Sequence, residues 1–373
     1  MDPQLLLFRR QYFQLFEPDF LAWPPKQLLK DLGVQGWLYN KLFNADEVTY
    51  LPPDRYRYRV LKPLVTKIEQ SIEDPEEDVG YAFISVHPFR IPFAIPPSRY
   101  HFSNFIPSPQ TISDELVTHL SSLVASGLLP EIAAVQQKSY VTFSCLSPEV
   151  NLSDVPEQEP TITVLERRNL ISGSTTTGYR TWEAALHLGS YLLSNPELIR
   201  DKNVFEPGAG TGFLSILCAK HLEAKHVTTT DGDESVVEAL KENLFLNGLD
   251  ESDTVKPSVL RWGRGLRGTW VEEDFEEWPC DVVVGADVTY DKTMISTLVA
   301  TLRFMFDLRP SLQVLLSTAV RNAETYEGLQ AACAHNKFNV KEIDFQQQPI
   351  REQTALFYAT AVPLKILSIT KPD

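Results

Sequence analysis

The sequence predicts a doubly wound α/β fold, built on a Rossmann-like parallel sheet, with a mainly helical domain before it. Residues 204–213 lead from short apolar residues into a turn with Gly208, Gly210 and Gly212, and an apolar helical run follows. Residues 281–286 form a continuous apolar stretch, which is typical of a strand buried on both faces of a parallel sheet. The stretches between them alternate between strand-like and helix-like patterns, as βαβ units do.

Two domains are expected, because 373 residues exceed the length of an average single domain. The first is the helical domain, residues 1–130, and the second is the α/β domain, residues 136–373. In the helical domain apolar residues recur at helical spacing, with Pro18 ending the first helix and Gly33 the second. Further helices are predicted near 37–42, 59–72 and 116–129. The acidic run 73–78 is expected to be a solvated turn, and the proline-dense stretch 83–109 an irregular crossing segment. No catalytic constellation lies in this domain, so we expect it either to recognise the substrate or to brace the core.

The elements of the second domain follow in order. Alternating residues predict a β-hairpin from 139–145 and 161–166, and the helix 183–194 follows, with Thr181 as its N-cap. After the glycine turn and its helix, the patterns predict a parallel sheet with two further helices and a terminal antiparallel pair. The predicted strands are 226–231, 255–260, 281–286 and 312–317, the helices 235–247 and 324–335, and the final pair 338–345 with 355–366.

Composition and charge narrow the function classes. A net charge of -15 disfavours direct nucleic-acid binding, because phosphates are repelled. The charge either attracts a basic protein partner or only contributes to solubility. There is no run of 18 apolar residues and no signal-peptide order at the start, so no membrane association is expected. The four cysteines have no CxxC spacing, so neither a metal site nor a disulfide framework is indicated. We therefore expect the reducing cytoplasm as the location.

The glycine turn indicates the kind of cofactor. Its spacing is GxGxG, whereas a dinucleotide site would place glycine or alanine where this chain has Phe213. Glu206, two residues before the first glycine, would repel a pyrophosphate but suits a cationic, phosphate-free cofactor such as S-adenosylmethionine. A nicotinamide oxidoreductase is the disfavoured alternative. Asp231, at the end of the next strand, is placed to accept hydrogen bonds from both ribose hydroxyls, with Asp233 as the alternative.

Aromatic and acidic residues at other strand ends complete the predicted site. Trp262 either covers an adenine face or belongs to the core, and Trp182 is either a buried anchor or a wall of the cofactor pocket. Asp287 and Tyr290 follow the buried strand 281–286, where open α/β sheets bind ligands, and there they would face the transferred group. The alternative is that Asp287 caps the next helix and Tyr290 packs against the N-terminal domain.

Four motifs give the chain a family resemblance: Thr181-Trp182, Gly208-Ala209-Gly210, Trp262-Gly263, and an acid-x-x-tyrosine motif from Asp287 to Tyr290. With them, residues 139–373 resemble the class I, seven-strand methyltransferases that use S-adenosylmethionine. Among these, the chain looks like the lysine methyltransferases of eukaryotic elongation factor 2. Residues 60–64 and 68–69 extend the resemblance more loosely into the helical domain.

The resemblance implies a protein-lysine methyltransferase with elongation factor 2 as its protein substrate. We also expect the protein to act in the cytoplasm as a monomer. It implies cofactor contacts from Trp182, Gly208, Ala209, Gly210, Asp231, Trp262 and Ala286, with Glu206 added from the charge of the cofactor. Asp287 and Tyr290 are the expected catalytic residues. Because a nearby anion favours the ammonium form of lysine, we expect Asp287 to capture and orient the amine and not to act as a strong base. The alternatives are another protein lysine, a small-molecule amine, or a non-catalytic methyltransferase-like binding module.

Overall fold

The computed structural model describes residues 1–72, 111–127, 137–151, 155, 158–167, 177–263 and 265–372. The chain forms two compact units, of which the first comprises Met1–Ala22, Tyr50–Pro53 and Leu129–Asp373 and the second Trp23–Thr49 and Asp54–Leu128. The first 22 residues thus pack with the α/β unit, while a functional boundary near residue 130 stays a prediction. The acidic run 73–78 and the proline-dense stretch 83–109 lie outside the described residues.

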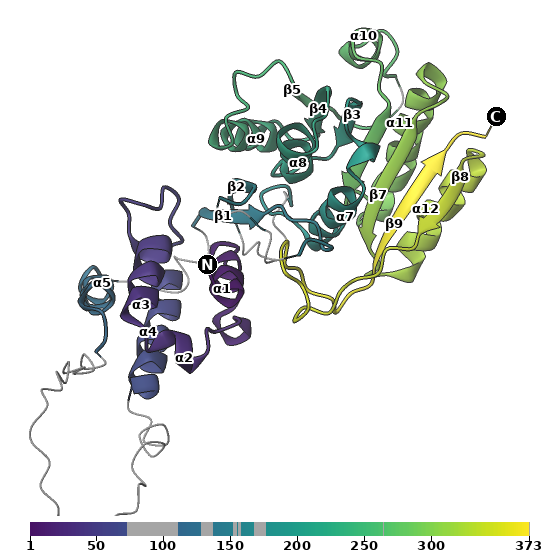
Figure 1. The fold of residues 1–373 in the computed structure, drawn as a ribbon. Coiled ribbons are helices and arrows are strands. Elements are labelled where there is room, and N and C mark those ends of the chain that lie inside the picture. Colours follow the sequence, from purple (N-terminus) through teal and green to yellow (C-terminus); the bar gives the residue numbers. More distant parts are fainter. Residues whose placement is uncertain are drawn as a thin grey trace, which may run out of the picture. The chain divides into compact units, whose positions relative to one another are not determined.

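The α/β unit contains a seven-stranded sheet in the order β5-β4-β3-β6-β7-β9-β8 (Figure 1). The strands from β5 to β7 are parallel, and β9 runs antiparallel between β7 and β8. Their bounds are β3 Asn203–Pro207, β4 His226–Asp231, β5 Val255–Val259, β6 Val282–Ala286, β7 Gln313–Ala319, β8 Asn339–Ile343 and β9 Leu364–Thr370. The order confirms the predicted doubly wound sheet with a terminal antiparallel pair.

The last strand lies later in the chain than predicted. Residues 355–366 were expected to pair with 338–345, but β9 begins only at Leu364. The backbone of Phe357 is instead bonded on both sides to the side chain of Gln14, and Tyr358 is held by Gln353. These side-chain hydrogen bonds replace a strand ladder, so residues 344–363 form an irregular connection.

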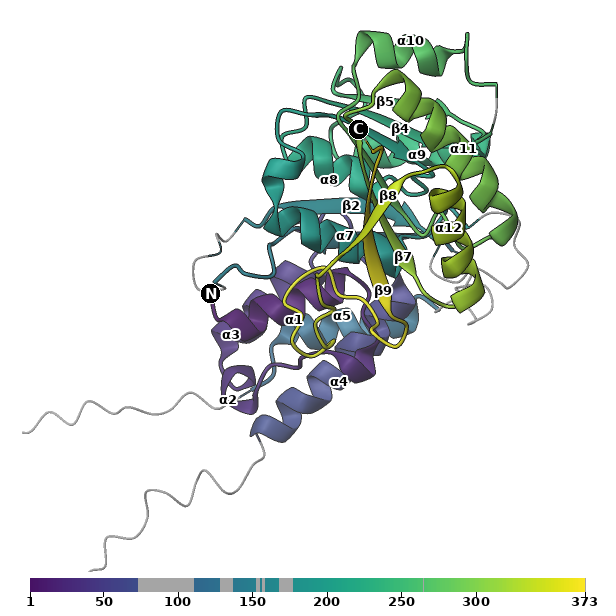
Figure 2. The ribbon, with the colours of Figure 1, turned by 90° about the vertical axis from the view of Figure 1, so that its right-hand side faces the viewer.

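Helices cover both faces of the sheet (Figures 1 and 2). One face carries α7, Glu183–Ser194, α8, Phe213–His221, and α9, Glu234–Leu246, with the short η4, Pro196–Leu198, after α7. The other carries α10, Trp270–Glu277, α11, Lys292–Leu308, and α12, Ala323–His335. Apolar residues of α10, α11 and α12 form one buried cluster with Phe205 of β3, Val283 of β6 and Leu316 of β7. The core thus fixes the strands whose carboxyl ends carry the predicted site.

The predicted hairpin is confirmed as a separate antiparallel pair, β1, Ser139–Ser144, with β2, Thr161–Glu166. It packs against α8 and α9, and α1, Pro3–Phe13, packs against β1. The side chain of Asn247, the residue directly after α9, bonds both the N–H and the carbonyl of Thr163 in β2. The edge of β2 that does not pair with β1 is therefore satisfied at Thr163 by an amide side chain.

The second unit is helical, as predicted, with α2 Lys26–Leu29, α3 Leu32–Leu38, the π-helical η2 Tyr39–Phe43, α4 Asp54–Ile72 and α5 Asp114–Ala125. The predicted helix end at Gly33 is wrong, because Gly33 lies in the first turn of α3. Asp31 caps that helix by accepting from the N–H groups of Gly33 and Val34, so a helix begins where an end was expected. In the first unit, the short η1, Pro18–Phe20, follows α1.

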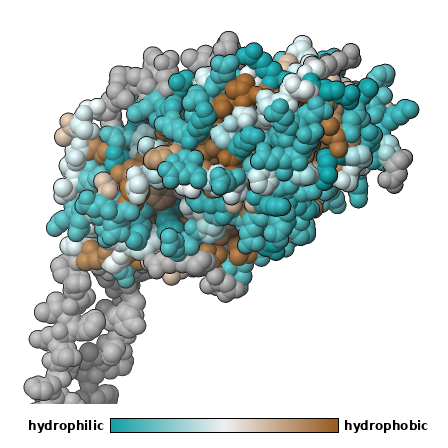
Figure 3. All heavy atoms as spheres, turned by 90° about the horizontal axis from the view of Figure 1, so that it is seen from above, coloured by the Kyte–Doolittle hydropathy of each residue, from teal (hydrophilic) through white to brown (hydrophobic). Residues whose placement is uncertain are grey.

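Hydrophilic residues dominate the face seen in Figure 3, with hydrophobic residues between them. Among the described residues few large apolar side chains are exposed, and two of them, Tyr290 and Met294, lie just after β6. No described helix combines the length and the apolar composition that a bilayer crossing requires.

Candidate functional site

The glycine turn after β3 takes a shape that side chains would obstruct. Gly208, Gly210 and Gly212 all have positive φ angles, +76°, +55° and +81°. A Cβ atom on Gly208 would lie 2.9 Å from Val288 Cγ1 and 3.1 Å from Trp262, and one on Gly210 would lie 3.1 Å from the carbonyl oxygen of Gly178. The turn can therefore lie between these groups only with glycine at both positions.

Glu206 lies beneath this turn. Its side chain accepts hydrogen bonds from the backbone N–H and the hydroxyl of Ser215 in α8, and only 2% of the residue is exposed. Burial raises the pKa of Glu206 to about 8, against the opposing effect of the Ser215 hydrogen bonds. In the described structure Glu206 thus braces the turn, and its contact with a cofactor stays a prediction. A carboxyl that is largely neutral at pH 7 also weakens the charge argument against a pyrophosphate.

Asp231 is placed as the sequence predicts, at the end of β4 beside the turn. Its two carboxylate oxygens accept from the N–H of Gly210, at 3.1 Å, and from the N–H of Asp233, at 3.2 Å. Burial raises the pKa of Asp231, while the backbone hydrogen bonds lower it. The alternative residue, Asp233, instead caps α9 through the N–H of Ser235 at 2.8 Å. The geometry therefore favours Asp231 over Asp233 for the ribose.

Trp262 follows β5 and borders the same turn from the other side. Its indole Nε1 is buried and has no hydrogen-bond partner among the described residues. Ala209 is buried in the turn, and Ala286 is half-buried at the end of β6. The turn, Asp231 and Trp262 thus form a cradle at the carboxyl ends of β3, β4 and β5, and its fit to an adenosine stays a prediction.

Asp287 follows β6 with a left-handed backbone conformation, φ +52°. Its residue exposure is 7%, its Oδ1 accepts from the N–H of Ala319 at 2.9 Å, and its Oδ2 lies 3.4 Å from Arg321 Nη1. Burial raises the pKa of Asp287, and the bonds from Ala319 and Arg321 oppose that rise. Strained backbone of this kind concentrates at functional sites. The alternative role as helix cap is wrong, because Asp291 caps α11 through the N–H of Thr293.

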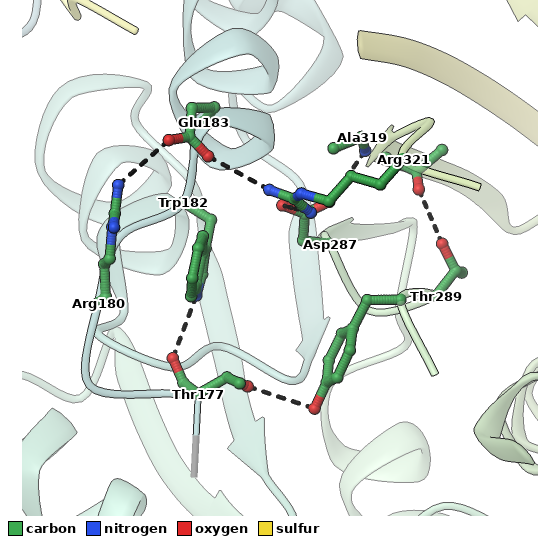
Figure 4. A network of polar contacts seen from close by, with 10 residues as sticks. Thr177, Arg180, Trp182, Glu183, Asp287, Thr289, Ala319 and Arg321 are labelled. Carbon is green, nitrogen blue, oxygen red and sulfur yellow. Dashed lines mark hydrogen bonds and ion pairs between the residues drawn. The ribbon is translucent and has the colours of Figure 1, made fainter. Parts of the chain in front are cut away.

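Tyr290 and Trp182 are joined through one residue that the sequence did not single out, Thr177. The Thr177 hydroxyl donates to the Tyr290 hydroxyl at 3.2 Å. Trp182 Nε1 donates to the Thr177 carbonyl at 3.1 Å (Figure 4). Tyr290 is 61% exposed, so its ring borders solvent at the mouth of the site. Trp182 is half-buried, so it is not a fully buried anchor, and its place in the wall of the cofactor pocket stays a prediction.

The predicted N-cap at Thr181 is wrong. Trp182 holds the cap position of α7, and no side chain caps that end. The Thr181 hydroxyl is instead bonded to the hydroxyl of Thr211 in the glycine turn at 2.8 Å, and its N–H donates to Glu166 of β2. Asn243 of α9 bonds the carbonyl of Thr211 as well. Side chains from α9 and from the segment before α7 thus hold the turn in place.

Arg321 is the main residue that the sequence analysis missed. It follows β7, and its guanidinium lies 3.4 Å from Asp287 Oδ2 and 3.4 Å from Glu183 Oε2 (Figure 4). The Trp182 ring lies between Arg321 and Arg180, with the guanidinium carbons 5.6 and 4.6 Å from its centroid. Arg321 lies at the carboxyl edge of the same parallel sheet as Asp287. That position was the one signal that pointed to it.

The described residues contain no group of three or more His, Cys, Asp or Glu that could hold a metal ion. All four cysteines are buried and free of disulfides. The carboxyl edge of the sheet thus carries the glycine turn with Asp231 beside it, and the buried Asp287 paired with Arg321.

Comparison with known proteins gives one consistent result. The family described as lysine methyltransferase matches residues 158–331. The Chaetomium thermophilum protein-lysine N-methyltransferase EFM3 is 41% identical over 99% of this chain and 98% of its own length. The Saccharomyces cerevisiae protein of the same name is 35% identical over 58% of this chain and 67% of its own. The human protein-lysine N-methyltransferase EEF2KMT is 25% identical over 76% of this chain and 81% of its own.

Proposed function

The chain belongs to the lysine methyltransferase family, and we propose that it methylates a lysine of translation elongation factor 2, with Asp287 and Tyr290 receiving that lysine. The protein is an S-adenosylmethionine-dependent protein-lysine N-methyltransferase, and its substrate is a protein. When bound, the cofactor supplies a methyl carbon on a cationic sulfur, so that the N–C bond forms from the amine lone pair while the C–S pair stays on sulfur.

The cradle at the ends of β3, β4 and β5 is our proposed cofactor site. Gly208, Ala209 and Gly210 let the ligand lie against the backbone, and Asp231 would accept hydrogen bonds from the ribose. Trp262, whose ring borders Gly208, would cover the adenine with its ring face. Trp182, Ala286 and Glu206 complete the proposed set, with Glu206 acting from beneath the turn.

Asp287 and Tyr290 carry the acceptor side of the proposal. The observation that supports it most directly is a buried carboxylate at the carboxyl end of β6, in strained backbone, beside the cradle. Such a carboxylate attracts and orients an ammonium group, and the exposed Tyr290 ring offers a face that a cation also prefers. The amine must lose its proton before it reacts, because the protonated form has no free lone pair. Asp287 therefore positions the amine without being the main base.

Elongation factor 2 is proposed as the substrate from the family resemblance, and the name of the human relative is consistent with it. The match to the Chaetomium protein spans both units of this chain, so any shared substrate recognition has the whole chain available to it. A net charge of -15 favours a basic surface on the partner and disfavours direct contact with nucleic acid. We propose that the second unit recognises the substrate or braces the core, and that the protein acts in the cytoplasm as a monomer.

The experiment is methyl transfer from labelled S-adenosylmethionine with purified elongation factor 2 and, separately, a eukaryotic lysate. We expect label on one elongation factor 2 lysine, located by peptide mapping. Label on another protein or on a small amine would leave the family intact and refute the substrate. Absence of label from every acceptor, with cofactor bound, would make the chain a binding module.

The Asp287→Asn variant tests the acceptor site. Since it removes the anion that positions the amine, we expect the single-turnover rate to fall by about a hundredfold or more. The cofactor dissociation constant should change little, because Asp287 is not part of the cradle. Asp291→Asn is the matched control, because it changes another acid of the same segment while asparagine can still cap α11. A wild-type rate in Asp287→Asn would place the acceptor site elsewhere.

Tyr290→Phe separates the two uses of the tyrosine. The variant keeps the ring but loses the hydroxyl that accepts from Thr177. A rate close to wild type is expected, because the exposed ring face is the part that can meet a cation. A large loss would instead assign the role to the hydroxyl, and with it to the link through Thr177.

A further inference from the structure

Arg321 places a permanent positive charge beside the acid that is proposed to receive the lysine. Its side chain is 44% exposed, yet it lies between two carboxylates, those of Asp287 and Glu183, at 3.4 Å from each. It also lies over one face of the Trp182 ring, which limits where the guanidinium can move. The contacts come from α7, from the end of β6 and from the end of β7, so the arrangement is built by the sheet and not by one loop (Figure 4).

The charges around Asp287 nearly balance. Glu183 faces it from the first turn of α7, Arg180 bonds Glu183 at 3.2 Å from the preceding segment, and Arg321 completes the set. Tyr290, from the segment after β6, is a further titratable side chain at this mouth. Two carboxylates and two guanidinium groups leave this group of four with no net charge. Without Arg321 the same group would carry one negative charge, next to the place where an amine is to arrive.

We propose that Arg321 is a positioning residue of the methyl transfer that keeps Asp287 from holding the target lysine as an ammonium ion, and thereby sets the pH at which the enzyme works. The inference rests on the proposed function, in which Asp287 receives the lysine. A lone buried carboxylate would bind the ammonium form most strongly and delay loss of its proton. A cation paired to that carboxylate weakens this preference while it leaves the hydrogen-bond acceptor in place.

The test is the pH dependence of the single-turnover rate at saturating cofactor and protein substrate, which reports groups in the bound complex. In Arg321→Gln the rising limb should move to higher pH by about one unit, so that the rate near neutral pH falls about tenfold and recovers in alkaline solution. Arg321→Lys keeps the charge, so the rising limb of its pH–rate profile should lie close to that of wild type. Lys292→Gln removes an exposed cation bonded to Glu324 on the same side of the sheet, and its limb should not move.

Three results would overturn the inference: a loss in Arg321→Gln that is equal at every pH, no loss at all, or a lysine variant that behaves as the glutamine variant does. The first would make Arg321 a purely structural support. Failure of the proposed function is a separate observation, a wild-type rate in Asp287→Asn. The ratio of the single-turnover rates of Arg321→Gln and wild type, measured as a function of pH, therefore tests the role of Arg321. The rate of Asp287→Asn tests the premise that Asp287 receives the lysine.

Discussion

Arg10→Met should destabilise the α/β unit strongly, because it removes the partner of a buried carboxylate. Arg10 on α1 is 2% exposed, and its Nε lies 3.1 and 3.0 Å from the two carboxylate oxygens of Glu159. Its Nη2 donates to the same carboxylate at 2.8 Å, and its Nη1 donates to the Thr354 carbonyl at 3.2 Å. One side chain thus ties the first helix to the segment before β2 and to the connection between β8 and β9.

The magnitude follows from what is left unpaired. Breaking a buried ion pair by removing one partner costs about 3 to 5 kcal/mol. The lower half of that range is expected here, because Arg9 lies 3.7 Å from Glu159 and is partly exposed, so some compensation remains. Arg10→Met/Glu159→Met should recover most of the loss, because two apolar side chains of similar size leave no buried charge.

The assay is the free energy of unfolding in urea, followed by a signal from the α/β unit. Lys138→Gln is the control, because its pair with Glu242 is exposed and such pairs contribute about 0 to 1 kcal/mol. Two results would refute the reasoning. One is a single variant within the range of the control. The other is a double variant as unstable as the sum of its single changes.

Two further predictions concern the glycine turn. Gly210→Arg should abolish cofactor binding in a folded protein, since a side chain there meets the Gly178 carbonyl at a positive φ angle; calorimetry with wild-type affinity would contradict it. Glu206→Gln should gain stability relative to wild type as the pH rises from 4.5 to about 8 in the absence of cofactor. In that pH window the unfolded chain releases the Glu206 proton, while the folded chain keeps it because burial raises the pKa of Glu206. The stability that this carboxyl gives to wild type at low pH is therefore lost as the pH rises. Urea unfolding at several pH values measures the difference, and a constant difference would mean that Glu206 is already ionised in the folded chain.

The parts of the site that the sequence predicted are those set by local chain geometry. Glycine at alternate positions after a short apolar strand specifies a turn with positive φ angles, and an acid at the next strand end reaches the same edge of the sheet. Gly208, Gly210 and Asp231 therefore lie where they were expected. Thr181 did not, because its hydroxyl had a distant partner, Thr211, that competes with the helix end. A threonine before a helix can form a capping hydrogen bond, but the tertiary structure decides which group it bonds.

The position of α1 shows a second limit. Helical spacing predicts that an apolar face will be buried, but it does not say against which element. The sequence interpretation assigned residues 1–130 to one helical domain, whereas the first 22 residues pack with the α/β unit. The clue was Arg10, which lies among the apolar residues of the first helix and needs a buried acid as partner. That acid, Glu159, is 149 residues away, in a polar stretch where no periodicity distinguishes it.

Arg321 and Asp287 show why a site residue can be predicted while the residue that tunes it is missed. Asp287 was identified because it directly follows a buried strand, and Arg321 is the second residue after the neighbouring strand β7. Both strands end at one edge, so their following residues meet, although 34 positions separate them. Had each charged residue after a parallel strand been considered as a member of one set, Arg321 would have joined Asp287 and Asp231. To predict such a site from sequence, the residues that follow all parallel strands of the sheet must therefore be considered together, and not one motif at a time.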